Sequence, residues 1–220
     1  MTTQKIIKTL KDDNEYYNGL GRQYLSNSDI GTLLKNPRDF GKKLEDSKEF
    51  AMGRYFHQLF LEPEKANFAL LEKEKVEVER WVDAMKTNLD FFDYINDSKN
   101  KYEVPNIKEI GGETWKGKAD IVGEDFIYDL KTTSSINDFK WNSRKYNYDS
   151  QAYIYQELFG KPMVFLVIDK TSLMMGFFSV SDESLERGRQ KVERAIEIYR
   201  KFYGDNPTED INQYYLYEEI

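Results

Sequence analysis

Residues 116–133 have the sequence Lys-Gly-Lys-Ala-Asp-Ile-Val-Gly-Glu-Asp-Phe-Ile-Tyr-Asp-Leu-Lys-Thr-Thr, and their pattern is the strongest indication of the fold. The apolar residues on either side of residues 123–125 suit β-strands, and those three residues suit a tight turn. If the loop consists of residues 124–125, counting outward places Asp120 directly opposite Asp129. The stretch therefore predicts a β-hairpin in which two aspartates face each other.

This pair of aspartates does not stabilise a hairpin, because cross-strand partners lie roughly 5 Å apart and like charges repel there. A bound divalent cation such as Mg²⁺ would neutralise the pair, since hard cations bind carboxylate oxygens. Lys131 follows Asp129 by two residues and so projects from the same face. Two carboxylates and an ammonium on one sheet face suit metal-dependent cleavage of a phosphodiester. The spacing leaves a second interpretation open, a solvated hairpin face with a salt bridge.

Composition narrows the class of protein. The chain has 220 residues, of which 40% are hydrophobic, so it is long enough for one domain with a substantial core. It contains no cysteine, which excludes disulfides and thiolate metal sites and fits a cytoplasmic location. The sequence shows no apolar run of membrane-spanning length and no signal peptide, so we expect no membrane partner. A net charge of −7 counts against a protein that coats nucleic acid, but a nuclease with a local basic channel fits it.

The periodicity of the chain predicts a mixed α/β (α+β) fold, in which a central mixed sheet with an antiparallel meander is flanked by helices. Helices are expected over residues 26–34, 47–61, 76–95, 148–159 and 182–203, with a short one from Pro37 through Phe40 and Leu44. Strands are expected over residues 101–110, 113–122, 126–132, 163–169 and 173–180, and a short one over 67–71. Residues 1–23 are expected to form an irregular or partly strand-like arm, 133–145 a polar loop, and 205–220 an aromatic tail that docks on the core or on a neighbouring subunit.

The only histidine, His57, lies inside the helix predicted over residues 47–61. This count excludes a multi-histidine zinc site and any serine–histidine triad without His57. A lone histidine in an aromatic-rich helix is more often a core or surface residue than a metal ligand, so the residue alone does not decide its role. Gly53, one turn earlier, costs about 1 kcal/mol in a helix interior. Its presence predicts that something packs closely against it.

Several short motifs in order along the chain resemble the PD-(D/E)xK nuclease superfamily, in its RecB-like branch. Asp120, then Asp129-Leu130-Lys131, then Gln151 and Tyr155 on one helix face follow the pattern Asp…Asp-x-Lys…Gln-x-x-x-Tyr. The first half carries Tyr24-Leu25-Ser26-x-Ser28, Asn36-Pro37-Arg38-x-Phe40 and Met52-Gly53-x-x-x-His57-x-Leu59-x-Leu61-Glu62-Pro63-Glu64. These resemble the exonuclease domain of RecE and its phage relatives, over roughly residues 24–155. The resemblance implies a restriction-endonuclease-like core in a single domain over residues 1–220.

The resemblance also implies roles for individual residues. His57, Asp120, Asp129 and the backbone carbonyl of Leu130 are expected to bind Mg²⁺ or Mn²⁺. Lys131 is expected to position or help deprotonate the attacking water and to offset charge on the phosphate. Gln151 and Tyr155 are expected to hold the DNA, and Ser26, Ser28, Arg38 and Arg54 are candidates for a 5′-phosphate pocket, with helix capping and surface charge as the alternative. The second acidic residue is Asp129 where many superfamily members have glutamate.

The implied activity is that of a Mg²⁺-dependent exonuclease that acts 5′→3′ on double-stranded DNA ends and leaves a 3′ single strand. The implied setting is recombination encoded by a phage or prophage in a bacterial cytoplasm, with a single-strand annealing protein as partner. Relatives of this kind form rings, which predicts a trimer or tetramer whose acidic outside surrounds a DNA channel. Two alternatives stay open: another RecB-like nuclease, such as a CRISPR-associated or single-strand-specific enzyme, and a non-catalytic module that binds DNA ends.

Overall fold

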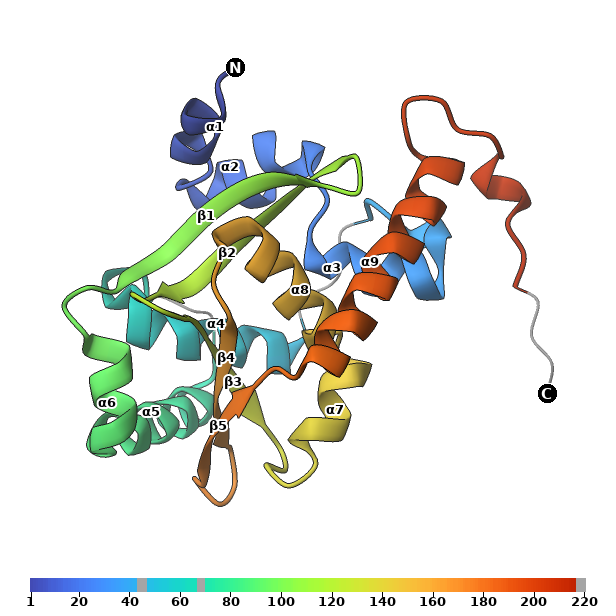
Figure 1. Ribbon diagram of the computed structural model, residues 1–220. Helices are drawn as coiled ribbons and strands as arrows, with labels where there is room; N and C mark the ends of the chain where they lie inside the picture. Colours follow the sequence, from blue (N-terminus) through green and yellow to red (C-terminus); the bar gives the residue numbers. More distant parts are fainter. Residues whose placement is uncertain (43–46, 67–69, 217–220) are drawn as a thin grey trace.

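A computed structural model shows a five-stranded sheet flanked by helices on both faces (Figure 1). The structure describes residues 1–42, 47–66 and 70–216. The strands are β1 (Lys101–Ile110), β2 (Glu113–Val122), β3 (Ile127–Thr133), β4 (Met163–Asp169) and β5 (Met175–Ser179), in the spatial order β1-β2-β3-β4-β5. All neighbouring strands are antiparallel except β3 and β4, which are parallel. The predicted mixed sheet and its antiparallel meander β1-β2-β3 are confirmed.

The hairpins have the turns and register that the sequence predicts. Gly111 and Gly112 both adopt positive φ angles, 61° and 82°, in the tight turn between β1 and β2. In the β2–β3 hairpin, Ile121 pairs with Tyr128 and Val122 with Ile127, which is the predicted register. That register aligns Asp120 with Asp129, and Leu130, the residue after Asp129, donates its N–H to the Asp120 carboxylate at 2.8 Å. The Asp120 side chain therefore links β2 to β3 directly beside Asp129.

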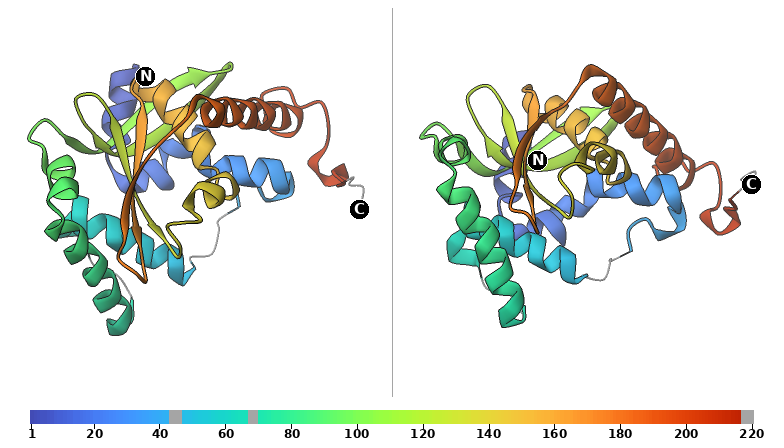
Figure 2. Two further views of the ribbon diagram at one scale, coloured as in Figure 1. Left: turned by 60° about the horizontal axis from the view of Figure 1, so that its bottom comes forward. Right: turned by 90° about the horizontal axis from the view of Figure 1, so that it is seen from below.

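Two layers of helices cover the sheet. On one face lie α3 (Asn27–Lys35), α8 (Tyr148–Phe159) and α9 (Asp182–Phe202), whose apolar side chains form one core cluster with Ala119 and Phe165. On the other face, α4 (Lys48–Leu61), α5 (Glu72–Thr87) and α6 (Leu89–Asn96) form a second cluster with Ile121 and Leu130. The two views of Figure 2 show these layers on opposite sides of the sheet. Successive sheet residues point to opposite faces, so strands β2 to β5 supply both cores, whereas β1 supplies only the first.

The N-terminal segment is helical, so the expectation of an irregular or strand-like arm is wrong. It forms α1 (Thr3–Thr9), α2 (Asp13–Tyr17) and the 3₁₀ helix η1 (Leu20–Gln23). Asp12 caps α2 by accepting the Glu15 N–H at 2.9 Å, and Tyr16 is buried. Helices this short are marginal in isolation. They persist here because they dock on the β1–β2 hairpin, where α1 contacts β1 and Lys116 of β2 donates to the Tyr16 carbonyl at 2.6 Å.

Two further expectations are corrected. The helix predicted over residues 76–95 is two helices, because the Asn88 side chain accepts the Phe91 N–H at 3.2 Å and caps α6. The expected loop over residues 133–145 contains α7 (Phe139–Lys145), whose buried residue Phe139 anchors it to the core.

The remaining short elements are η2 (Pro37–Asp39), η3 (Pro63–Lys65) and η4 (Ile211–Gln213). The short helix predicted from Pro37 is the single turn η2, and Leu44 lies outside the described residues. The strand expected over 67–71 lies partly outside them, and Leu71 begins α5 as its N-cap. In the tail, Tyr214 packs edge-on against Phe202 at 5.9 Å, whereas Tyr215 is exposed.

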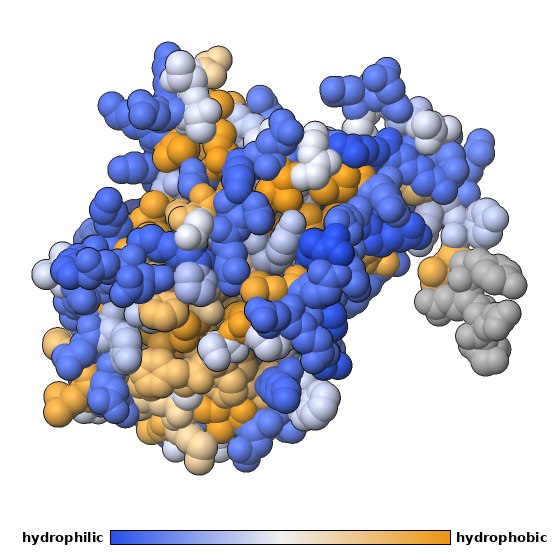
Figure 3. Space-filling view, viewed as in Figure 1, coloured by the Kyte–Doolittle hydropathy of each residue, from blue (hydrophilic) through white to orange (hydrophobic). Residues whose placement is uncertain are grey.

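Apolar side chains also reach the surface. Figure 3 shows hydrophobic atoms gathered in the lower part of the view, where β4 and β5 lie, while the exposed side of α9 is hydrophilic. Phe177 on the edge strand β5 is partly exposed, and its ring packs against Phe91 and Tyr94 of α6 at 4.3 and 5.1 Å.

Candidate active site

A cavity of about 400 Å³ opens between α4, the β2–β3 hairpin and the N-terminal helix α2. His57 of α4, Asp120 of β2, and Leu130 and Lys131 of β3 line it. Asp129 lies beneath this lining and is only 2% exposed. The structure therefore brings the residues singled out in the hairpin together with the histidine, which comes from a helix more than 60 residues earlier.

His57 and Asp120 form a pair at the edge of this cavity, with His57 Nδ1 3.3 Å from Asp120 Oδ2. Burial lowers the pKa of His57, but the adjacent Asp120 carboxylate more than offsets burial and leaves this pKa raised. Burial by itself raises the pKa of Asp120, and the imidazole with the nearby Lys131 brings it below its usual value. Asp120 is thus held as an anion.

Asp129 binds two partners, one with each carboxylate oxygen. Lys131 Nζ lies 2.5 Å from Oδ2, and Gln151 of α8 donates through Nε2 to Oδ1 at 2.5 Å. Burial raises the pKa of Asp129 and outweighs the opposing effect of Lys131. Burial lowers the pKa of Lys131, but the Asp129 carboxylate outweighs it and raises this pKa. Lys131 also lies over the Tyr148 ring, with Nζ 5.0 Å from the ring centroid.

The donor set suits a hard divalent cation. Within the described part of the chain, no three His, Asp or Glu side chains stand close enough to hold a metal ion as they are oriented. The Asp129 carboxylate contacts Lys131 and Gln151. The carboxylates of Asp120 and Asp129 would supply oxygen ligands to such an ion, and His57 a nitrogen ligand. Leu130, whose carbonyl is the fourth expected ligand, lines the cavity.

Gln151 and Tyr155 lie one turn apart on α8, but they contact different strands. Gln151 orients Asp129, whereas Tyr155 donates its hydroxyl to the Lys118 carbonyl of β2 at 2.9 Å. The close approach requires Gly117, because a Cβ there would lie 2.6 Å from Leu158 Cδ1 and 2.9 Å from Tyr155 Cε2. Tyr155 thus fixes the helix that carries Gln151.

Among the residues expected to bind a 5′-phosphate, only Arg54 lines the cavity, from α4. Ser28 contacts Ser26 at 2.8 Å between hydroxyl oxygens, at the start of α3. Ser26 also donates its hydroxyl to Asp29 at 2.7 Å. Arg38 donates to the carbonyls of Ile211 and Asn212 at 3.4 and 2.6 Å, so it holds the C-terminal segment.

The cavity contains acidic residues that sequence reasoning missed. Glu103 of β1 lines it, and burial together with Asp120 raises the pKa of Glu103 to about 8. Its backbone is in the left-handed region, with φ 48°, which is strained for a residue with a Cβ. The register of the β1–β2 hairpin contained the signal, since counting from the turn at residues 111–112 places Glu103 opposite Asp120.

The N-terminal segment also reaches the cavity. Asp13 and Tyr17 of α2 line it, and Asp13 forms an ion pair with Lys118 of β2. No local sequence pattern predicts the contact between Asp13 and Lys118, because the two residues lie more than 100 positions apart.

Gly53 corrects another expectation. A Cβ added at this residue would meet no heavy atom within 4 Å, so nothing in the described structure packs closely against it. Gly53 faces open space and lines the cavity.

This sheet, with two carboxylates and a lysine on adjacent strands, defines a PD-(D/E)xK nuclease-type domain. The sequence profile of the PDDEXK-like domain of unknown function (DUF3799) matches residues 32–206, and the chain belongs to that family. No curated protein matches the chain.

One solved structure shares the fold. The crystal structure of a "Putative exonuclease" from Eubacterium rectale has a TM-score of 0.69 at 20% sequence identity and covers 95% of each chain. An alkaline exonuclease from Laribacter hongkongensis is more distant, with a TM-score of 0.42 at 11% identity, covering 83% of this chain and 91% of its own.

Among the described residues, no helix is both long and apolar enough to cross a membrane.

Proposed function

We propose that this nuclease is a Mg²⁺-dependent exonuclease that degrades double-stranded DNA ends 5′→3′ and leaves a 3′ single strand. The proposal rests on the convergence of His57, Asp120 and Lys131 on one cavity wall, with Asp129 paired to Lys131 beneath it. When bound there, Mg²⁺ supplies an activated water and stabilises negative charge on the phosphate.

The residues of the chain divide the remaining work. Lys131, held between Asp129 and the Tyr148 ring, presents a fixed positive charge that offsets the charge of a phosphate and orients the attacking water. Gln151 keeps Asp129 in place through its hydrogen bond. His57 orients Asp120 in the same way. Asp120 also accepts the Leu130 N–H, so both carboxylates are oriented before substrate binds.

Labelled duplexes test the proposal. Wild-type protein with Mg²⁺ is expected to release a 5′ label before a 3′ label, while Lys131→Ala abolishes cleavage and His57→Ala weakens it together with metal binding. Release of the 3′ label first would reverse the polarity. Preference for single strands would favour another RecB-like nuclease, and binding of ends without any cleavage in Mg²⁺ or Mn²⁺ would favour a non-catalytic module.

The proposal extends to assembly and setting. The chain has a net charge of −7, yet it is proposed to act on DNA. A trimeric or tetrameric ring with the basic residues inside would explain how such an acidic protein binds DNA. The recombination role, with a single-strand annealing partner in a phage- or prophage-carrying bacterium, follows from the 3′ strand that such a reaction leaves. Sedimentation equilibrium at working concentration tests the ring, and a monomer would contradict it.

A further inference from the structure

A second cavity lies behind the active site, and the mechanism above does not use it. It has a volume of about 310 Å³ and lies between α7, the beginnings of α8 and α9, and strands β4 and β5. Tyr148 lines both cavities. The centroid of its ring lies 5.0 Å from Lys131 Nζ on the side of the active site. The same ring packs on Phe165, with 5.4 Å between the ring centroids, and Phe165 lines the second cavity. The Tyr148 side chain thus borders both cavities.

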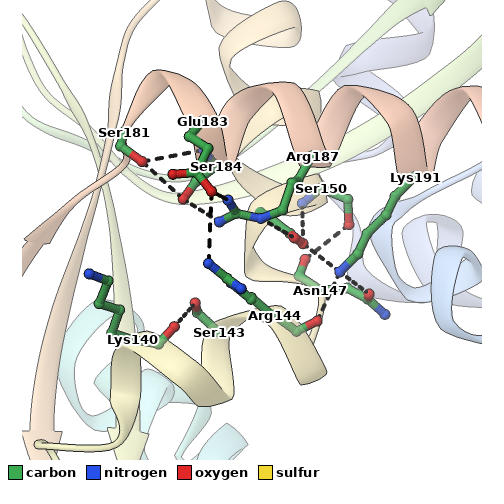
Figure 4. Close-up of polar contacts among 11 residues, drawn as sticks. Lys140, Ser143, Arg144, Asn147, Ser150, Ser181, Glu183, Ser184, Arg187 and Lys191 are labelled. Carbon is green, nitrogen blue, oxygen red and sulfur yellow. Dashed lines mark hydrogen bonds and ion pairs between the residues drawn. The ribbon is translucent and has the colours of Figure 1, made fainter.

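The rim of the second cavity is cationic. Lys140 and Arg144 of α7 and Arg187 of α9 line it, in a chain whose net charge is −7. Figure 4 shows these side chains together with the hydroxyls of Ser143, Ser181 and Ser184. The carboxylate among the lining residues, Asp149, is almost fully buried; Lys191 lies 2.8 Å from one of its oxygens and Arg187 Nε 4.0 Å from the other. The cations Lys140, Arg144, Arg187 and Lys191 outnumber the carboxylates of Asp149 and Glu183, so the charge at the rim is positive.

The wall of this cavity is aromatic. Phe139 and Phe178 line it with ring centroids 4.5 Å apart, and Tyr148 and Phe165 continue the surface. Aromatic rings beside arginine and lysine are the combination that holds single-stranded nucleic acid, because bases stack on rings and phosphates pair with the cations. A cavity for an apolar ligand alone would not need three cations at its rim.

A single exposed carboxylate competes for these cations. Glu183 of α9 is 79% exposed in its side chain and pairs with Arg187 at 2.6 Å and with Arg144 at 3.9 Å. Exposed ion pairs of this kind contribute little stability, so a phosphate can replace Glu183 as the partner of both arginines.

From these contacts we infer that the second cavity binds one nucleoside 5′-phosphate unit of DNA, with its phosphate on Arg144, Arg187 and Lys140 and its base against Phe139 and Phe178. This inference rests on the proposed function. The unit is either a residue of a single strand that passes behind Tyr148 or the released mononucleotide, since both present the same phosphate and base.

Trp141 provides the readout for a binding experiment. Its side chain is 62% exposed. The centroid of its ring lies 5.8 Å from Lys140 Nζ and 5.6 Å from the Arg144 guanidinium carbon. The other tryptophans, Trp81 and Trp115, are buried. Acrylamide therefore quenches mainly Trp141, and protection from quenching reports occupancy. Titrations without divalent metal, using thymidine 5′-monophosphate in one arm and an unphosphorylated (dT)₈ oligonucleotide in the other, distinguish free product from strand.

Two charge reversals on α7 form a matched pair. Arg144→Glu is expected to weaken binding of the probe about tenfold. Lys145→Glu, an exposed neighbour outside the cavity lining, is expected to change it less than twofold. Glu183→Gln is expected to strengthen binding, since it removes the competing carboxylate. Equal weakening by both reversals, or no protection of Trp141 by either probe, would overturn the inference.

The same titrations separate this inference from the proposed function. Wild-type protein that binds the probe but does not cleave labelled duplexes with Mg²⁺ would sink the proposed exonuclease and leave the nucleotide site standing. An active enzyme whose Arg144→Glu variant binds the probe normally would sink the nucleotide site alone.

Discussion

Gly53→Ala is the substitution for which structure and local sequence give opposite expectations. A glycine in a helix interior costs about 1 kcal/mol relative to alanine, and an added Cβ at Gly53 meets no heavy atom within 4 Å. The methyl group therefore brings the helix preference without a clash. We expect the metal-free protein to gain about 0.5–1 kcal/mol in its free energy of unfolding. For a chain of 220 residues this raises Tm by about 1–4 °C.

The expected effect on activity has the opposite sign. Gly53 lines the cavity of the active site, one helical turn before His57, so the added methyl occupies space where substrate approaches α4. We expect cleavage to fall about tenfold or more. A glycine retained for substrate access rather than for packing would be a case of stability exchanged for activity.

Gly117→Ala serves as the counterpart in the same experiment. Its methyl would lie 2.6 Å from Leu158 Cδ1, and we expect a loss of about 1–3 kcal/mol from overpacking. Thermal unfolding followed by circular dichroism, with cleavage measured on the same samples, gives both readouts. A fall in Tm for Gly53→Ala, or equal Tm changes for the two variants, would refute the reasoning from local space.

Three other perturbations have expected outcomes. Burial lowers the pKa of Lys116 to about 8, so the unfolded chain binds more protons than the folded protein between pH 8 and 10.5. The free energy of unfolding should therefore rise by about 1–2 kcal/mol over this range after solvent screening. In urea titrations Lys116→Met should flatten that rise, whereas the exposed Lys108→Met should not. Gly188→Ala would press a methyl against the Asp149 carbonyl at the α8–α9 contact, and its calorimetric loss should reach about 3 kcal/mol; a loss below about 0.5 kcal/mol would contradict that packing. Mg²⁺ at about 100 times its Kd should stabilise the wild-type protein by about 2.7 kcal/mol. This corresponds to a rise in Tm of about 5–10 °C, which EDTA should reverse. Asp120→Asn should abolish the rise, and an unchanged rise in that variant would place the ion elsewhere.

Local sequence signals predicted much of the sheet and its helices. The turn at residues 111–112 and the loop at 124–125 defined both hairpin registers, because a two-residue loop leaves one alignment of the flanking strands. The strand at Met163–Asp169 and the helix at Tyr148–Phe159 have their predicted bounds. Each is bounded by a local signal, such as the αL glycine Gly160.

Errors occurred where a segment depends on distant partners. The helices of residues 1–23 are too short to be stable alone, and they rely on contacts such as Lys116 with the Tyr16 carbonyl. Helix α7 is similarly held by the burial of Phe139. The break at Asn88 is the exception, since asparagine is a common N-cap and the signal was local.

The sequence alone determined which residues share a face: Asp120, Asp129 and Lys131 on the hairpin, and Gln151 with Tyr155 on a helix, because these relations follow from periods of two and 3.6 residues. What those faces contact depends on the tertiary structure. It turned Gln151 to Asp129 and Tyr155 to a backbone carbonyl, and it brought α2 to the cavity wall. It also placed a second, cationic cavity behind Tyr148. Such meetings depend on the packing of elements far apart in the chain, and no period within one element encodes them.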